Sequence, residues 1–582
     1  MAYAAFGGMA MRARWELKTV DERSVECLSN KLSLPRLLAR ILCSRGFSEP
    51  SSAMDFIKPS IGKLYDPFLM ADMSKAAKRV FEAIRNREGI LVHGDYDADG
   101  ICAAAMLSRK LSQWGAKVYW FIPDRFIDGY GVSMRAIRMA RSINVTLMLT
   151  CDCGTAAHEK VELARRYGID TIIVDHHEPK GSLPTAYAVL NPKRADCEYP
   201  FRELSATGVA FKLLCAIADF SGFESPIEDE LCLDLVGIAT VADVVPLIDE
   251  NRVLGWHGLS ALSKRSRVGL RKLMECASLR SSRVTGAHVS FIIAPRLNAA
   301  GRLANARDAV KLLLTEDEAE AGAFADRLEA LNRERQEEEE RTLEEAIELI
   351  ESDVDVSSER VIVLAKRGWH QGVIGIVASK IVELYHRPAI LIAIEGDFGK
   401  GSARSIHGFN ITEALGACRH LLTAYGGHSM AAGFTVRASE VSRLRRSLNE
   451  IASQRLTDEE LTPKLRIDAQ AHPKELSQEV AHGMLLFEPC GCGNPKPLLA
   501  LLGAQVIDSS FVGGSRGHLK LLVQKHGEEL ELFGFRMRHV RDMFHQGQSI
   551  DLCFTIDAPV GGSAKPSLRI KSLRESTCEG TL

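Results

Sequence analysis

Thr171–His177 reads TIIVDHH, an apolar, β-branched run that ends in an aspartate and two histidines. Polar side chains close three other apolar runs: HGDYDADG (His93–Gly100) follows Ile90–Val92, Asp152 closes the run that begins at Val145, and Asp243 closes Gly237–Ala242. Carboxylates, together with imidazole, are ligands for divalent cations such as Mn²⁺ and Mg²⁺. Their repeated placement where buried strands are expected to end therefore points to one shared metal site.

The spacing of the apolar runs predicts a doubly wound α/β domain. The runs Ile90–Val92, Val118–Ile122, Val145–Thr150 and Thr171–Val174 are short and apolar at consecutive positions, as in strands buried on both faces of a sheet. Helix-like stretches separate them: Ile101–Trp114, Ser133–Arg141 and His158–Tyr167. Such alternation predicts a parallel sheet, and parallel sheets bind ligands beyond the carboxyl ends of their strands, near a switch in strand order.

A carboxylate cluster of this density requires positive charge. Without a metal, neighbouring carboxylates would repel one another and raise each other's pKa values. A phosphodiester is also an anion, and two divalent ions a few ångströms apart offset its charge and acidify a bound water. We therefore expect a site for two Mn²⁺ or Mg²⁺ ions that hydrolyses phosphate esters. The residues at these expected strand ends are Asp97, Asp99, Asp152, Asp175, His176 and His177.

The ordered motifs resemble the DHH phosphoesterases, and within them the RecJ family of single-strand-specific 5′→3′ exonucleases. In the first half of the chain the resemblance rests on Gly94–Gly100, Asp152-Cys153-Gly154, Asp175-His176-His177-Glu178 and Asn191-Pro192. In the second half it rests on PRLNAAGR (Pro295–Arg302), GWHQGVIGI (Gly368–Ile376), GSARS (Gly401–Ser405), and GGH (Gly426–His428) with Ala431-Ala432-Gly433. It covers nearly the whole chain from Leu32 onward.

The resemblance implies roles for further residues near the metals. The expected metal ligands are Asp97, Asp99, Asp152, His176 and Asp243, with Asp152 as the expected bridge. His93 would be an additional metal ligand. His177 would donate a hydrogen bond to the scissile phosphate and stabilise its growing charge, while Asp175 would orient the site. Arg296 would help to hold the scissile phosphate.

The resemblance also implies a pocket for the 5′-terminal phosphate. Serine, arginine and glycine at close spacing form a cradle of backbone N–H groups, a hydroxyl and a guanidinium fork. The residues expected to bind substrate are Arg125, Ser402, Arg404 and His428. A pocket that holds the chain end at a fixed distance from the metals would explain degradation of single-stranded DNA from the 5′ end to mononucleotides, in DNA repair and recombination.

Five regions are expected along the 582 residues. They are an N-terminal helical region (1–70), a DHH metal-binding catalytic domain (71–255), a connecting helical segment (256–352), a smaller α/β DHHA1 substrate-binding domain (353–463) and an OB-like single-strand-binding β-barrel (464–582). The barrel is predicted from alternating apolar residues in Leu519–Val523, Leu530–Phe533, Asp551–Ile556 and Leu568–Ile570. Glu316–Glu351 is expected to form one long helix between lobes, with Asn332–Thr342, which lacks apolar residues, standing in water.

Composition and charge lead to expectations about solubility, the cysteines and the binding partners. The apolar fraction is 46%, and no apolar run approaches membrane-spanning length, so a soluble protein is predicted. The 14 scattered cysteines indicate reduced thiols in the cytoplasm, and Cys490 and Cys492 are interpreted as structural. The net charge of −2 decides nothing about nucleic acid, and the basic run Lys264–Arg283 fits either a solvated helix face or a DNA track. The expected partner is single-stranded DNA; the resemblance adds a single-strand-binding protein and a RecQ-like helicase, and a monomer is expected.

Two other functions remain open. A DHH phosphodiesterase acting on oligoribonucleotides or cyclic dinucleotides would share the first two lobes, but those proteins are shorter, and the C-terminal barrel favours a long polymer. A non-catalytic replication scaffold would keep the fold and lose the ligands, whereas the acidic and histidine ligands of the core set are all present in this chain.

Overall fold

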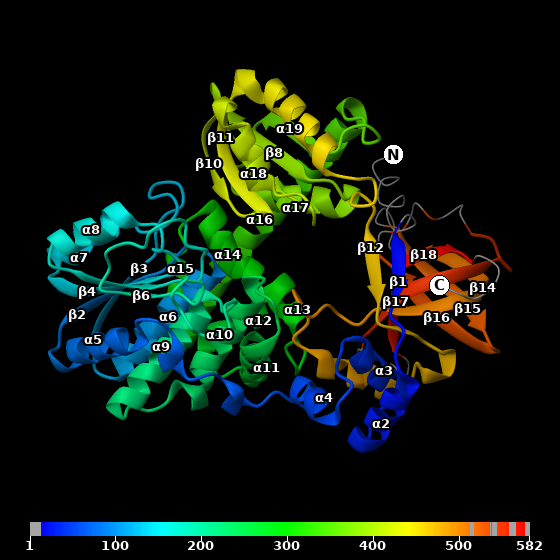
Figure 1. The fold of residues 1–582 in the computed structure, drawn as a ribbon, viewed down its shortest axis with the longest axis horizontal. Helices are drawn as coiled ribbons and strands as arrows, with labels where there is room; N and C mark the ends of the chain where they lie inside the picture. Colours follow the sequence, from blue (N-terminus) through cyan, green and yellow to red (C-terminus); the bar gives the residue numbers. More distant parts are fainter. Residues whose placement is uncertain are drawn as a thin grey trace. The chain divides into compact units, whose positions relative to one another are not determined.

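The computed structural model (Figure 1) describes residues 13–512, 517–535, 537, 540, 544–557 and 566–576. The chain separates into two compact units. Unit 2 consists of Lys58–Arg335 and Phe487–Lys496, and unit 1 contains the rest of the chain.

Unit 2 is built on a five-stranded parallel sheet with the order β3-β2-β4-β5-β6. The strands are β2 (Gly89–His93), β3 (Lys117–Phe121), β4 (Val145–Cys151), β5 (Asp170–Val174) and β6 (Ala188–Leu190), and the neighbouring strands pair parallel. The strand order reverses between β2 and β4, which is the switch point where such sheets bind ligands. The predicted doubly wound sheet is confirmed; β3, predicted as buried on both faces, is a half-exposed edge strand.

Helices cover both faces of this sheet, because successive strand residues point to opposite sides. Ile90 and Val92 pack into the core formed with α5 (Met73–Arg85), α6 (Ala98–Gln113) and α9 (Ala206–Ser221). Leu91 packs into the smaller core formed with α7 (Met134–Ser142) and α8 (His158–Arg166). The Ser133 hydroxyl caps α7 by accepting hydrogen bonds from the N–H groups of Arg135 and Ala136.

The apolar run before Asp243 is helix α10 (Glu230–Ala242), so the expectation that a strand precedes this aspartate is wrong. Gly237 of α10 lies against Gly258 of α11 (Asp249–Lys264), and a Cβ on Gly237 would come within 2.6 Å of the Gly258 Cα atom. The helix is buried nearly all round, and a short apolar run in a buried helix has the same pattern as a buried strand. Unit 2 continues with α12 (Val268–Cys276), α13 (Gly286–His288), a π-helix (Val289–Ile293, labelled η4), α14 (Ala294–Leu303) and α15 (Arg307–Leu314).

Helix α16 (Glu318–Asp353) confirms the predicted long helix, but its polar middle does not stand free in water. Glu339 is 5% exposed and forms an ion pair with Lys380 of α17 (Ile374–Tyr385), and Thr342 is fully buried. The polar residues of this stretch therefore use one helix face for packing, which an apolar pattern alone does not reveal.

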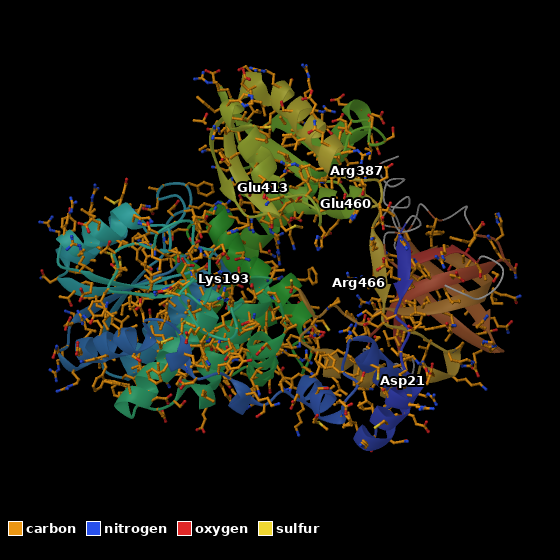
Figure 2. The ribbon with its side chains drawn as sticks, viewed as in Figure 1. Asp21, Lys193, Arg387, Glu413, Glu460 and Arg466 are labelled. Carbon is orange, nitrogen blue, oxygen red and sulfur yellow. The ribbon has the colours of Figure 1, made fainter. Side chains whose placement is uncertain are left out.

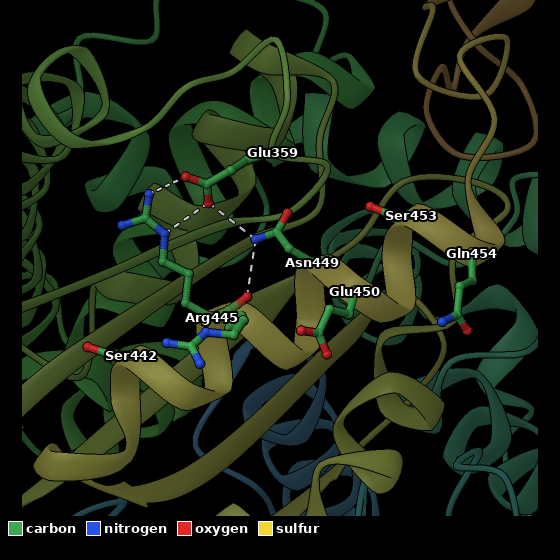
Figure 3. A pocket seen from close by; sticks show the side chains of 8 residues that line it. Glu359, Ser442, Arg445, Asn449, Glu450, Ser453 and Gln454 are labelled. Carbon is green, nitrogen blue, oxygen red and sulfur yellow. Dashed lines mark hydrogen bonds and ion pairs between the residues drawn. The ribbon is translucent and has the colours of Figure 1, made fainter.

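Unit 1 contains a mixed five-stranded sheet with the order β10-β11-β9-β8-β7. Its strands are β7 (Ile362–Arg367), β8 (Ala389–Glu395), β9 (Phe398–Arg404), β10 (Leu422–Gly427) and β11 (Ala431–Arg437), flanked by α17, α18 (Ile411–Ala417) and α19 (Val441–Arg455). Polar side chains tie α19 to the segment before β7: the guanidinium of Arg445 donates to both carboxylate oxygens of Glu359, and Asn449 Nδ2 donates to Glu359 at 3.2 Å (Figure 3).

The C-terminal strands of unit 1 close into a barrel, as predicted. The strands are β14 (Leu499–Val512), β15 (His518–Lys525), β16 (Glu528–Gly534), β17 (Ser549–Asp557) and β18 (Ser567–Glu575). The order β14-β15-β16-β18-β17, with β17 pairing back onto β14, removes the sheet edges. The remaining elements of this unit are β1 (Arg14–Leu17), α2 (Glu22–Leu32), α3 (Arg36–Ser44), α4 (Pro50–Ile57), β12 (Lys464–Ile467), β13 (Ala469–Gln470) and α20 (Gln478–Gly483).

The basic run Lys264–Arg283 is largely neutralised within the protein. Lys264 pairs with Glu230, Arg271 with Glu318, and Arg267 with buried Asp234 at 2.8 Å. Arg265 donates to the carbonyl oxygens of Leu279 and Ser281. These internal partners do not support the interpretation of this run as a DNA track. Among the described ranges, no helix is long and apolar enough to cross a membrane.

Candidate metal centre and active site

The chain that leaves β2 brings three carboxylates to the switch point. Asp97 caps α6, because its Oδ1 atom accepts hydrogen bonds from the N–H groups of Asp99 at 3.1 Å and Gly100 at 3.2 Å. Asp95 and Asp99 are both buried. A Cβ atom on Gly100 would lie 2.6 Å from the Cα atom of Asp95, so only glycine lets this turn of the helix approach the aspartate so closely.

Asp152 follows β4 directly and adopts the left-handed conformation, with φ of 62°. Its N–H group donates to the carbonyl oxygen of Val174 on β5 at 3.0 Å, and Thr150 Oγ1 donates to the carbonyl oxygen of Cys153 at 3.0 Å. These bonds hold a sharp turn that aspartate tolerates better than most residues do. The carboxylate is thereby placed, buried, beside the end of β2.

Asp175 organises the residues that follow β5. Its Oδ1 atom accepts hydrogen bonds from the N–H groups of His176 at 2.8 Å and His177 at 3.2 Å, and lies 2.7 Å from His177 Nδ1. Its Oδ2 atom accepts from the Thr155 N–H at 3.0 Å. Burial opposes ionisation of Asp175, but the bond to His177 and the two imidazoles outweigh it and lower its pKa. Asp175 is therefore an anion that fixes both histidines, as the expected orienting role requires.

The potential ligand atoms converge although they come from different elements. His176 Nε2 lies 3.3 Å from Asp152 Oδ1 and 3.5 Å from Asp243 Oδ2. Within each of three groups, the potential ligand atoms lie within 4.8 Å of one another. The groups are Asp95, Asp97 and Asp152; Asp99, His176 and Asp243; and Asp152, His176 and His177. Asp152 belongs to two of these groups. All five expected core ligands are thus brought together, with Asp95 and His177 in addition.

The shifted pKa values of these side chains indicate that the cluster is suited to bind positive charge. Burial, reinforced by neighbouring aspartates, raises the pKa values of Asp95, Asp152 and Asp243 well above the usual range. Burial raises the pKa of Asp99 to about 6, and burial with the charge of His177 lowers the pKa of His176 to about 3. The charge of Lys193, labelled in Figure 2, opposes the shift at Asp243 without cancelling it. Divalent cations would favour the ionised carboxylates and the neutral imidazole.

The donor atoms fit such cations. Asp95 Oδ1 is buried and has no hydrogen-bond partner among the described atoms. Buried carboxylate oxygens ordinarily find a donor, so an unsatisfied one aimed into an acidic cluster needs a cation. Oxygen ligands with one imidazole suit Mn²⁺ and Mg²⁺. The described residues therefore fit the metal that the sequence predicts.

His93, expected as an additional ligand, is not brought into these groups. Its ring is fully buried; Nε2 accepts a hydrogen bond from the Ser133 N–H at 3.0 Å, and Nδ1 lies 3.8 Å from the Cys153 sulfur. Burial lowers the pKa of His93 to about 4, which keeps the imidazole neutral. His93 follows Leu91 by the strand period of two residues, so it points toward the α7 side of the sheet.

The expected phosphate-binding residues of unit 2 differ in their placement. The Arg125 guanidinium lies 5.4 Å from the centre of the ring of Tyr96, the residue between Asp95 and Asp97 in the sequence. The positive charge of Arg125 partly offsets the rise in the pKa of Asp95. Arg296, by contrast, pairs with Glu329 of α16 at 2.6 Å and donates to the carbonyl oxygen of Ile292 at 2.7 Å. The structure thus places Arg125 by the cluster and Arg296 in an ion pair within the connecting helices.

The expected substrate residues of unit 1 gather on the β9–β11 side of the mixed sheet. Arg404 donates to the Ser402 hydroxyl at 3.2 Å, and Ala431, the register partner of Arg404, accepts a hydrogen bond from the His428 N–H at 2.8 Å. A Cβ on Gly375 would lie 2.8 Å from Ser402 Oγ, so the glycine of α17 leaves room at this cradle. Ser402 and Arg404 therefore lie together on β9, and the backbone of His428 is bonded to Ala431 on the neighbouring strand β11.

Two residues of the site were not selected from the sequence. Asp95 is the first aspartate of the D-x-D-x-D pattern in His93–Gly100, so its position beside two selected aspartates was the available signal. The Tyr130 hydroxyl lies 3.0 Å from His177 Nε2, opposite the bond to Asp175. Tyr130 comes from the loop before α7, and no sequence pattern links it to a histidine that follows β5.

The comparisons with known proteins agree with this architecture. Residues 89–240 match the DHH family, N-terminal domain; residues 358–454 match the DHHA1 domain; and residues 467–572 match the RecJ OB domain. The parallel sheet with its acidic and imidazole cluster, followed by the mixed sheet, therefore defines a protein of the DHH class with a DHHA1 domain.

Whole-chain relatives are more specific. The single-stranded-DNA-specific exonuclease RecJ of Bacillus subtilis is 39% identical over 97% of this chain and 71% of its own length, and that of Escherichia coli is 35% identical over 85% and 87%. The crystal structure of RecJ in complex with Mn²⁺ from Thermus thermophilus superposes with a TM-score of 0.83 at 30% identity, covering 97% of this chain and 80% of that chain. The chain belongs to the RecJ family.

Proposed function

We propose that this protein is a metal-dependent exonuclease that degrades single-stranded DNA from its 5′ end to mononucleotides in DNA repair and recombination. The observation that carries the proposal is the convergence of Asp97, Asp152, His176 and Asp243 on one cluster, in a family whose named relatives are single-stranded-DNA-specific exonucleases. The solved Thermus thermophilus relatives contain Mn²⁺ in one case and Mg²⁺ in another, which are the ions that the donor set fits.

The residues that would hold two such ions are Asp95, Asp97, Asp99, Asp152, His176 and Asp243, with Asp152 shared between them. A bound pair of divalent cations supplies positive charge that offsets the phosphodiester and lowers the pKa of water. His177, held by Asp175 and Tyr130, would donate a hydrogen bond to the scissile phosphate. Arg296 would reach the scissile phosphate only after giving up its pairing with Glu329.

His93 is better placed to position the site than to bind a metal. Both ring nitrogens face protein partners: the Ser133 N–H and the Cys153 sulfur. Cys153 is adjacent to Asp152, and Ser133 begins α7 after the loop that carries Arg125. We therefore propose that His93 links the metal-site turn at Asp152 to this loop.

Polarity is proposed to come from recognition of the 5′-phosphate. In unit 2 the proposed contact is Arg125, which lies by the metal cluster. In unit 1 the proposed contacts are Ser402, Arg404 and His428, of which Arg404 donates to the Ser402 hydroxyl. Planar guanidinium groups bind phosphate through paired N–H donors, so they can select a terminal phosphate. The C-terminal barrel, which matches the RecJ OB domain, would add a surface for the rest of the strand.

The decisive experiment compares matched substrates. End-labelled single-stranded DNA carrying either a 5′-phosphate or a 5′-hydroxyl is digested with Mn²⁺, beside duplex DNA and a dinucleotide. The proposal predicts mononucleotides released from the 5′ end of the single strand, with the 5′-phosphorylated strand preferred in the native protein and that preference reduced in Arg125→Ala. Preference for the dinucleotide would favour the phosphodiesterase alternative, and Mn²⁺ binding without any cleavage would favour the scaffold.

The regional limits and cellular context are also proposals. We propose the five regions 1–70, 71–255, 256–352, 353–463 and 464–582, a monomeric state and a cytoplasmic location. The resemblance to the RecJ family supports a single-strand-binding protein and a RecQ-like helicase as partners. Limited proteolysis tests the limits, and sedimentation of the purified chain with each candidate tests the monomer and the partners.

A further inference from the structure

The segment Phe487–Lys496, which reads FEPCGCGNPK, packs in unit 2 against the connection between α10 and α11. The Leu247 N–H donates to the carbonyl oxygen of Cys492 at 2.8 Å. A Cβ on Gly491 would come within 2.8 Å of the Leu247 side chain, and one on Gly493 within 3.2 Å of Pro246. Asn494 closes the segment by donating to the carbonyl oxygens of Phe487 and Pro489, each at 2.7 Å. This tight packing leaves the segment little freedom to shift.

The α10–α11 connection carries a strained residue directly after a candidate metal ligand. Val244 follows Asp243 and has φ of 60°, in the left-handed region that β-branched residues avoid. Such strain persists only where surrounding contacts hold it. Here the holding contacts are the Leu247–Cys492 hydrogen bond and the bond from Asn251 Nδ2 to the Pro246 carbonyl oxygen at 3.0 Å. The connection that begins at Asp243 is thus bonded, four residues later, to the segment that contains Cys492.

This segment also carries a pair of cysteines separated by one glycine. Cys492 is exposed, whereas the other described cysteines are buried or half-buried. Cys490 is half-buried, and its thiol lies 3.5 Å from the Phe487 carbonyl oxygen. Accessible thiols attack disulfides as thiolates, and a second thiol nearby can resolve the mixed product.

From these contacts we infer that Cys490 and Cys492 form a thiol-modification site that controls the Asp243 side of the metal centre. The inference rests on the proposed metal function of Asp243. The Cys492 thiolate attacks a low-molecular-weight disulfide, forms a mixed disulfide and releases one thiolate. Cys490, after losing its proton to solvent, attacks the Cys492 sulfur and releases the second thiolate. Two protein thiols are oxidised to one disulfide, and the small disulfide is reduced to two thiols.

The consequence follows from the short ring that this bridge closes. Joining Cys490 to Cys492 across a single residue requires the backbone at Gly491 to turn, and this moves the Cys492 carbonyl oxygen away from the Leu247 N–H. Val244 then relaxes and Asp243 leaves its place in the cluster. We expect Mn²⁺ affinity to weaken about tenfold, which is equivalent to about 1.4 kcal/mol. This free energy is no larger than the backbone strain of one non-glycine residue in the left-handed conformation.

The test uses the full chain treated with oxidised glutathione. Intact-mass and peptide-mass measurements follow the thiols, and calorimetric titration with Mn²⁺ follows the metal site. We expect a Cys490–Cys492 disulfide with weakened Mn²⁺ binding that a reductant restores. Cys490→Ser should accumulate glutathione on Cys492, and the double variant Cys490→Ser/Cys492→Ser should keep its Mn²⁺ affinity after treatment. Cys276→Ser, which removes a half-buried thiol of the same unit, should behave like the native protein.

Three outcomes would overturn the inference: no disulfide or glutathione adduct at these two cysteines, a disulfide without a change in Mn²⁺ affinity, or the same loss of affinity in the treated double variant. The mass measurement and the Mn²⁺ titration do not depend on nuclease turnover. A reduced protein that binds Mn²⁺ and cleaves nothing would therefore refute the proposed function while leaving this inference standing.

Discussion

The His176 imidazole faces the Asp152 carboxylate, with Nε2 of the first 3.3 Å from Oδ1 of the second. The two residues follow neighbouring parallel strands, β5 and β4, and therefore meet at the same sheet edge. The pKa of Asp152 is raised and the pKa of His176 is lowered, so both side chains favour their neutral forms in the absence of a cation. The pair is therefore suited to bind a cation rather than to form a salt bridge.

Replacing Asp152 by asparagine should separate metal binding from folding. Asparagine has the same shape and tolerates the left-handed backbone at this position. We expect weaker Mn²⁺ binding and a cleavage rate lower by more than about a hundredfold. Replacing a residue that only hydrogen-bonds to a metal ligand can already lower activity by up to about a hundredfold. Calorimetric Mn²⁺ titration and end-labelled DNA digestion provide the measurements, with the exposed Asp397→Asn as the matched control.

Without metal, Asp152→Asn should be at least as stable at neutral pH as the native protein. The folded-state pKa of Asp152 is raised, so its ionised form destabilises the fold as pH rises through that pKa, and a neutral amide removes this effect. Full nuclease activity in Asp152→Asn would refute the metal assignment.

Divalent metal should stabilise the folded protein. Ions that bind only the native state add about 2.7 kcal/mol when present at about 100 times their Kd. We expect thermal unfolding to shift upward with Mn²⁺ and to return to its starting value with excess chelator, because the ions satisfy Asp95 and relieve repulsion among the aspartates. Cleavage should stop with the same chelator, and an unchanged unfolding temperature would argue against the centre.

Tyr130→Phe should slow turnover without affecting metal binding. The change removes the hydroxyl that lies 3.0 Å from His177 Nε2 and leaves the bond between His177 and Asp175 in place. Loss of one such bond is worth about 1 kcal/mol, or roughly a fivefold lower kcat. Steady-state digestion of 5′-phosphorylated DNA measures kcat, with Tyr119→Phe on β3 as control. Equal losses in both variants would show that the hydroxyl at position 130 has no special role.

His93→Gln distinguishes a positioning residue from a ligand. Because His93 lies outside the ligand groups, we expect the number of bound Mn²⁺ ions to stay the same, while kcat falls and the unfolding temperature drops. The buried hydrogen bonds that it makes suggest a cost of about 1–3 kcal/mol. Calorimetric stoichiometry decides the matter: loss of one ion per chain would restore His93 as a ligand.

Breaking the buried ion pair of Lys212 and Glu250 should destabilise unit 2. Lys212 Nζ lies 2.9 Å from Glu250 Oε1, both side chains are buried, and Glu250 also accepts from the Tyr199 hydroxyl at 2.6 Å. Lys212→Met leaves a buried carboxylate unpaired and should cost about 3–5 kcal/mol. Thermal unfolding measures this, with Arg165→Ala from the exposed pair with Glu162 as control. Lys212→Met/Glu250→Gln should recover part of the loss.

Much of the site could be predicted because ligands after parallel strands follow a local rule. Asp97, Asp152 and His176 each come at or just beyond the end of a short apolar strand, and parallel strands end at a common edge. Asp243 lies in the cluster although a helix, and not the expected strand, precedes it, since a buried helix and a buried strand give the same short apolar run. The expectation that the middle of the long helix is exposed was wrong. Glu339 is buried there in an ion pair with Lys380, and hydropathy does not predict such a pair.

The amino-acid sequence by itself determined the parallel sheet, the order of the clustered acidic and histidine residues along the chain and the membership of the RecJ family, because these depend on residue type and spacing along one strand or turn. Only the tertiary structure decided that Asp95 joins the metal cluster, that His93 turns to Ser133 and Cys153, and that Tyr130 meets His177. The physical reason is that side-chain direction at the end of a strand, and contact between distant segments, depend on packing against elements that no local pattern specifies.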